Sequence, residues 1–284
     1  MSLVHEFSGA DRWLQSESVG PPLSTPMFIN RLVIASVFIS LVWKVKYFAM
    51  GFMICFAHPL KDSFFPTILS NTFVSMGCYF LAMMSCIVIV STRQTKVALG
   101  CAVALAASLY ILCIHQQTYN DVTFLTCFWT AIWSIWFTSR IDRDPENALL
   151  EKGVFLSHVV LSVIFLGGAV GKMTPGYWTG QVLYEIYFAD RDFWFFNTLR
   201  ESFADETLHF ISGWYSRFVI GTELACSLLW LLPPRLASLL ALVTCCGICI
   251  MSNVLLFSVL TCLIGLSLVG LVRSTISVAE PVGT

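Results

Sequence analysis

Long apolar runs separated by short polar connections dominate the chain. A helix of about 20 apolar residues is long enough to cross a bilayer. Residues 236–272 are apolar almost throughout and would form a helix of roughly 55 Å, well beyond the hydrocarbon core of about 30 Å, so we expect a break at Ser252-Asn253. The pattern predicts an all-α, polytopic transmembrane helical bundle of about eight spans. The other runs cover residues 28–47, 71–90, 97–114, 122–137, 154–170 and 218–232.

Polar stretches divide the rest of the chain. Residues 1–26 lack a basic region followed by a short apolar core, so they do not read as a cleaved signal peptide. We expect them to be a polar N-terminal segment, residues 27–273 to form a single transmembrane domain, and residues 274–284 to form a C-terminal tail. Residues 48–69 are candidates for a shallow re-entrant or interfacial piece.

The segment 171–216, between the fifth and sixth runs, interleaves aromatic and charged residues. Such mixtures suit the headgroup level of a membrane, where an apolar ring and a polar tip are both satisfied. The sequence predicts two amphipathic helices along the outer leaflet. They form either an aromatic belt with solvated charges, or the roof of a cavity that an amphiphilic substrate enters from the lipid. Trp178 and Tyr184 are candidate substrate-binding residues under the second reading.

The composition supports a membrane location and excludes several classes. Of 284 residues, 57% are hydrophobic and only 12% are charged, with a mean hydropathy of +0.79. A soluble domain is nearer about 45–50% apolar and about 25% charged. The chain is therefore neither a soluble enzyme nor a nucleic-acid binder nor disordered. Nine of the 16 Lys and Arg residues fall on one side of the predicted spans, which favours cytoplasmic N- and C-termini.

Two ionisable residues fall in or beside apolar runs. Glu223 lies inside the sixth run, where a charge costs about 2.5–3.5 kcal/mol, so it either has a partner or acts as a Brønsted acid in an apolar cavity. Lys172 follows a run of small residues at the end of the fifth run, where a neighbouring helix can approach closely. It is a candidate base, or else an interfacial lysine that extends to the headgroups.

A third candidate lies in the connection between the third and fourth runs. Asp121 directly precedes a predicted helix, so it is either a helix cap or a catalytic acid. Its neighbour Asn120, and Asn253 at the predicted break, are candidate substrate-binding residues. The histidines His58, His158 and His209 stand singly, without ligand spacing, so no metal site is expected.

Residues 165–187, FLGGAVGKMTPGYWTGQVLYEIY, resemble the vitamin K-dependent γ-carboxylase-like membrane proteins, the HTTM-domain family. Lys172, Met173, Trp178 and Gly180 match its motif, and the similarity continues through Glu223 and Pro234-Arg235 to residues 252–258. The resemblance implies that Lys172 is the base that starts oxidation of reduced vitamin K.

The chain also departs from that family. Ile250 stands where the family has a histidine, and Asn120-Asp121 stands where it has an Asn-His pair. No counterpart of the large lumenal domain that recognises the propeptide appears before Thr284. Peptide glutamate carboxylation is therefore not expected, and the resemblance is to the transmembrane core alone.

Three functions remain open. The favoured one is a membrane enzyme that acts on an isoprenoid or prenylated quinone-type lipid by intramembrane acid/base chemistry, including terpene cyclisation of a lyase type, in which aromatic rings stabilise carbocations. The second is a non-catalytic membrane accessory or assembly protein. The third is a small-solute transporter, which the lack of an internal repeat disfavours. The partners expected are the lipid bilayer and such a lipid, with no nucleic acid. The sequence identifies no cofactor.

Overall fold

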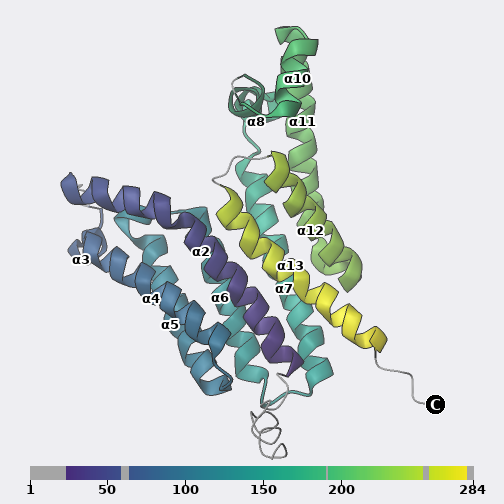
Figure 1. The fold of residues 1–284 in the computed structure, drawn as a ribbon. Helices are drawn as coiled ribbons and strands as arrows, with labels where there is room; N and C mark the ends of the chain where they lie inside the picture. Colours follow the sequence, from purple (N-terminus) through teal and green to yellow (C-terminus); the bar gives the residue numbers. More distant parts are fainter. Residues whose placement is uncertain (1–23, 59–63, 190, 252–255, 280–284) are drawn as a thin grey trace, which may run out of the picture.

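The computed structural model describes residues 24–58, 64–189, 191–251 and 256–279, and over these residues the chain is helical with no strand (Figure 1). Among the described residues, six helices are long and apolar enough to cross a membrane. The predicted all-α, multi-pass class is thus confirmed. The six are α2 (Thr25–Ala57), α4 (Thr72–Ser91), α5 (Thr95–Ile114), α6 (Val122–Arg140), α7 (Glu146–Gly171) and α12 (Pro234–Met251).

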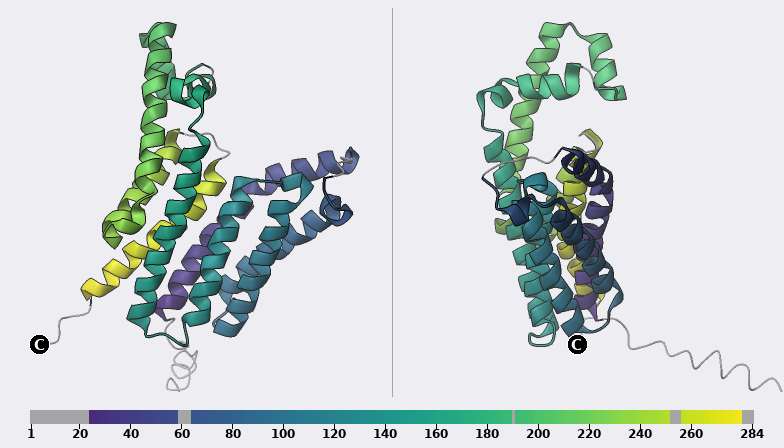
Figure 2. Two further views of the ribbon diagram at one scale, coloured as in Figure 1. Left: turned by 180° about the vertical axis from the view of Figure 1, so that it is seen from behind. Right: turned by 90° about the vertical axis from the view of Figure 1, so that its left-hand side faces the viewer.

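Two more long helices complete the bundle. α11 (Asp205–Cys226) packs on α7, and α13 (Phe257–Ala279) packs on α12 and α2. α2 begins and α13 ends at the same end of the bundle (Figures 1 and 2). This lower end also carries the loop from α6 to α7, and the upper end is where α7 ends at Gly171. Residues 1–23, most of the predicted N-terminal segment, lie outside the described residues, as do residues 252–255 with the predicted break.

The bundle has two apolar cores that share α2, α6 and α13. One lies among α2, α4, α5, α6 and α13, and the other among α2, α6, α7, α11, η3 (Leu229–Leu231), α12 and α13. Small residues allow the close crossings, as expected for helices packed in lipid. A Cβ atom on Gly265 of α13 would lie 1.9 Å from Ser36 Oγ of α2, and one on Gly153 of α7 would lie 2.6 Å from the Phe137 ring of α6.

The structure changes the predicted boundaries of the first run. α2 continues without interruption from Thr25 to Ala57, so residues 48–57 are the end of a long helix rather than part of a re-entrant piece. This end runs across the top of the bundle in Figure 1. Gln117 Nε2 donates a hydrogen bond to the Phe48 carbonyl at 3.3 Å and ties it to the loop after α5. After the undescribed residues 59–63, the chain forms the short helix α3 (Thr67–Ser70).

The aromatic segment folds into a compact unit above the bundle (Figure 2). It consists of α8 (Pro175–Thr179), α9 (Gln181–Leu183), the π-helix η2 (Tyr184–Ala189), α10 (Trp194–Ser202) and the first half of α11. We call residues 175–189 and 191–216 the cap unit. Its own core contains Leu183, Tyr187, Phe188, Phe196 and Leu208.

One glycine is required where the cap unit turns back on itself. Gly180 has φ +86°, and a Cβ atom there would lie 2.4 Å from the Gly213 backbone nitrogen of α11. Only glycine allows this conformation and this approach together. The predicted boundary between the aromatic segment and the sixth run is wrong, because α11 is one helix across it. The sixth run also ends early as an α-helix, at Cys226, and continues as a 3₁₀ turn, η3 (Leu229–Leu231), before α12.

Candidate functional site

Lys172 and Glu223, the two ionisable residues singled out from the sequence, meet at the upper end of α7. Lys172 Nζ lies 2.8 Å from Glu223 Oε1 and 2.9 Å from Oε2, so the ammonium donates to both carboxylate oxygens. Glu223 is only 7% exposed, and the Lys172 side chain is 26% exposed. Lys172 also donates to the Gly168 carbonyl at 3.4 Å.

The local sequence explains this pairing. Lys172 caps the C-terminal end of α7, where carbonyl groups lack helical partners and favour a cation. A Cβ atom on Gly168 would lie 3.3 Å from Glu223 Oε2, so the small residue makes room for the carboxylate. The arrangement is that of an ion pair that fastens α11 to α7. Each group compensates the charge of the other, and neither faces the cavity described below.

Asp121 is engaged in two other contacts, away from that pair. Its Oδ1 accepts the Thr123 backbone N–H at 2.9 Å and so caps α6, and its Oδ2 lies 2.6 Å from Lys44 Nζ of α2. The neighbouring Asn120 is exposed and has φ +55°, a left-handed conformation that asparagine tolerates better than most residues. Both residues therefore have clear roles in shaping the loop between α5 and α6.

The remaining candidates are spread over the cap unit. Trp178 is 54% exposed, and its ring lies under the Arg217 guanidinium, 5.8 Å from the guanidinium carbon. The Tyr184 hydroxyl donates to Asp205, and its ring stacks on His209 with centroids 3.6 Å apart. Asn253 lies outside the described residues. The structure thus brings together only Lys172 and Glu223 of the predicted site.

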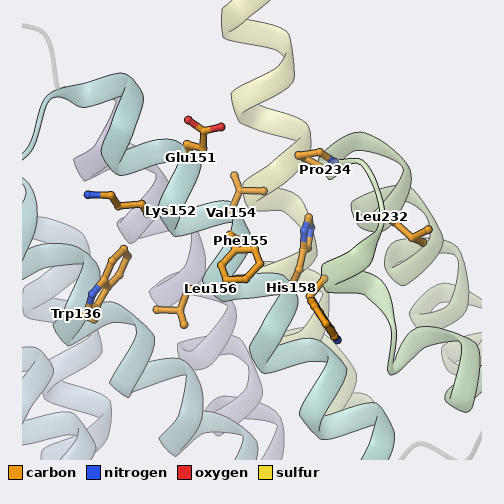
Figure 3. A pocket seen from close by; sticks show the side chains of 10 residues that line it. Trp136, Glu151, Lys152, Val154, Phe155, Leu156, His158, Leu232 and Pro234 are labelled. Atoms are coloured by element: carbon orange, nitrogen blue, oxygen red, sulfur yellow. The ribbon is translucent and has the colours of Figure 1, made fainter.

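A cavity lies at the lower end of the bundle, where none of these candidates is found (Figure 3). Its volume is about 660 Å³, and it is an open pocket lined by α6, the first half of α7, η3 and the start of α12. Its wall is mostly apolar and aromatic, which is typical of sites for lipid-like molecules. The lining residues are Trp136, Glu151, Lys152, Val154, Phe155, Leu156, His158, Trp230, Leu232 and Pro234.

The polar groups of the cavity are unevenly placed. His158 is 2% exposed, and its Nε2 forms a 2.9 Å hydrogen bond with Ser238 Oγ of α12. Glu151 and Lys152 lie one to two turns nearer the helix start, where Lys152 also pairs with Asp144 at 3.3 Å. A ligand would therefore meet an apolar wall with one imidazole and a charged rim.

Sequence reasoning missed this cavity and placed no function on His158. His58, His158 and His209 stand singly in the sequence, without metal-ligand spacing. The position of His158 inside the apolar run 154–170 is a signal of a structural or functional role, because a buried polar side chain in a membrane helix needs a partner or a role. Among the described residues, no three His, Cys, Asp or Glu side chains gather as metal ligands.

Comparisons with known proteins give no relative: no protein family, curated protein or solved structure matches this chain. The resemblance to the carboxylase-like family stays a prediction.

Proposed function

We propose that this chain is an eight-span integral membrane protein that binds an isoprenoid or prenylated quinone-type lipid and carries out acid/base chemistry on it. The eight spans are α2, α4, α5, α6, α7, the second half of α11 continued by η3, α12 and α13. An even number of spans accords with α2 beginning and α13 ending at one end of the bundle (Figure 1). That end is cytoplasmic, as the charge distribution favours, and the cap unit lies at the opposite membrane surface.

The observation that carries the proposal is the cavity with its single imidazole. Its volume of about 660 Å³ falls within the range of about 300–1,000 Å³ usual for small-molecule sites. Trp136, Phe155 and Trp230 suit a prenyl chain, and the charged rim formed by Glu151 and Lys152 suits a polar head or a headgroup. Glu151 and Lys152 lie in the second turn of α7, near the lower end of the bundle, so we expect the lipid to enter from the cytoplasmic leaflet.

The groups present favour a proton shift within a prenylated quinone over protonation of an alkene. An imidazole base takes the proton from the prenyl carbon next to the ring and returns it to a ring oxygen, so the product is an isomer of the substrate and no oxidant is needed. Protonation of an alkene needs a far stronger acid, and Glu223 is paired with Lys172 instead. His158 is then the acid/base residue, and Ser238 holds its ring. A prenylated quinone is the substrate class that best fits.

The test uses the full-length protein and a prenylated quinone with two to four isoprene units. We expect binding to quench tryptophan fluorescence, with the quenching reduced in Trp230→Phe. His158→Gln should keep the affinity within about threefold and abolish product formation in lipid extracts of a producing host, as expected when a general acid/base is lost.

His58→Gln is the matched control, because His58 is exposed at the end of α2 and does not line the cavity. It should behave like the unmodified protein in both assays. Unchanged product levels in His158→Gln would contradict the catalytic role of this residue. Equal quenching in Trp230→Phe and the unmodified protein would contradict binding in the cavity.

A second candidate function is that of an accessory or assembly protein. The specific observation in its favour is that Lys172, Glu223 and Asp121 are all engaged in contacts that hold helices together. Isolation of a stable protein partner, with no lipid retained in the cavity, would favour this role over the enzymatic one.

A further inference from the structure

Arg217 of α11 lies between two indole rings on the surface of the cap unit. Its guanidinium carbon is 5.5 Å from the Trp214 ring centroid and 5.8 Å from that of Trp178 in α8. Its Nε donates to the Trp178 carbonyl at 3.4 Å. These contacts fix the direction of the guanidinium, and the side chain stays exposed.

No carboxylate neutralises this cation within the part of the chain that the structure describes. Glu223, the acid two turns further along α11, is already bound to Lys172. Asp205, three turns the other way, accepts from the Tyr184 hydroxyl and lies 3.8 Å from His209. The N–H groups of Arg217 that Trp178 does not use are therefore open to an external anion.

The position of Arg217 relative to the bilayer follows from α7. From Lys152 to Lys172 this helix rises about 30 Å, which equals the thickness of the hydrocarbon core. Lys172 therefore marks its upper boundary. The Glu223 carboxylate lies about 6 Å inside this boundary, because it is in contact with Gly168, one turn below Lys172. Arg217 is about 9 Å further out along α11, at the level of the headgroups. The side chain of Phe218, the next residue on α11, is 70% exposed.

We infer that Arg217, flanked by Trp178 and Trp214, binds the phosphate of an anionic membrane lipid at the membrane surface opposite the cavity. A guanidinium donates two parallel hydrogen bonds to a phosphate, and indole rings favour the headgroup layer. The site is independent of the proposed function, because it lies beyond the upper end of α7 whereas the cavity lies at the lower end.

The experiment measures lipid retained by the purified full-length protein by native mass spectrometry. The probes are phosphatidylglycerol and phosphatidylcholine carrying the same acyl chains. We expect preferential retention of phosphatidylglycerol, reduced about tenfold in Arg217→Gln and less in Arg217→Lys, as expected for the loss of one charge-assisted contact. Arg143→Gln, which changes an exposed arginine in the α6–α7 loop, is the matched control and should leave the retention on this site unchanged.

Two further measurements make each outcome decisive. A melting temperature of Arg217→Gln within about 2 °C of the unmodified protein shows that lost lipid reflects the site and not the fold. If the variant unfolds, Trp214→Phe takes its place, and we expect partial loss of the lipid. Equal retention in Arg217→Gln and Arg143→Gln would overturn the inference. Displacement of the lipid by millimolar inorganic phosphate would identify a site for free phosphate and would overturn the assignment to a lipid.

Discussion

Replacing Lys172 by methionine removes the ammonium from the Lys172–Glu223 pair and leaves a carboxylate that is 7% exposed. Breaking a fully buried pair from one side costs about 3–5 kcal/mol. The Lys172 side chain is 26% exposed, so partial screening reduces the expected loss of stability to about 2–3 kcal/mol. Glu223→Gln leaves an ammonium that can extend to the headgroups, and we expect a smaller loss of about 1–2 kcal/mol.

The double variant K172M/E223Q reveals whether the two residues act together. With neither charge left, its loss should be smaller than the sum of the single losses by about 1–2 kcal/mol. The assay is unfolding of the four proteins in one detergent, with Lys46→Met as a control at an exposed lysine that should cost less than about 0.5 kcal/mol. Additive losses, with no coupling between the two substitutions, would refute the view that this ion pair fastens α11 to α7.

The same variants separate a structural pair from a catalytic one. If the pair only joins two helices, the folded double variant retains lipid binding and product formation. If Lys172 is the base that the family resemblance implies, the double variant loses the product even where it is folded.

Three further substitutions test other parts of the account. Gly270→Ala places a Cβ atom 2.2 Å from Ser238 Oγ, so it should destabilise the protein by about 1–3 kcal/mol in thermal unfolding and weaken lipid binding. Gly247→Ala is the control: its Cβ atom would meet nothing within 4 Å, and it should leave the stability unchanged. Gly180→Ala should loosen the cap unit and speed its cleavage in limited proteolysis, because it combines φ +86° with a clash against Gly213. Burial lowers the pKa of His115 from its ordinary 6.5, and the hydrogen bond to the Asn71 carbonyl opposes this shift. The unfolded chain therefore takes up the proton at a higher pH than the folded protein does, so the stability should fall as the pH drops below 6.5. His115→Asn should flatten this part of the pH profile of the melting temperature, and an unchanged profile would contradict the assignment.

The sequence predicts the helices well because membrane spans depend on local composition. Runs of apolar residues placed α4, α5, α6 and α12 within a few residues of their observed ends. It could not predict that α11 continues from the cap unit into the sixth run. That continuity depends on tertiary contacts, such as the hydrogen bond from Ser212 Oγ to the Gly180 carbonyl.

The site was predictable only in part, for a physical reason. The cost of a charge in an apolar run singles out Glu223 by itself, and the end of a span singles out Lys172. Their pairing joins residues on two helices, 51 positions apart, and no spacing rule specifies it. The cavity is harder still to predict, because its walls come from α6, α7, η3 and α12, and His158 is distinguished only by the neighbours that those elements bring to it.

Photo-crosslinking with a diazirine-bearing prenylated quinone tests the central claim most directly. The account predicts that the full-length protein is labelled at residues 151–158 and 230–234, around the cavity, and that unlabelled prenylated quinone removes this labelling. Labelling that is confined to the exposed face of α4 around Phe73 and Phe80, and that resists competition, would show a lipid-coated scaffold without a binding site.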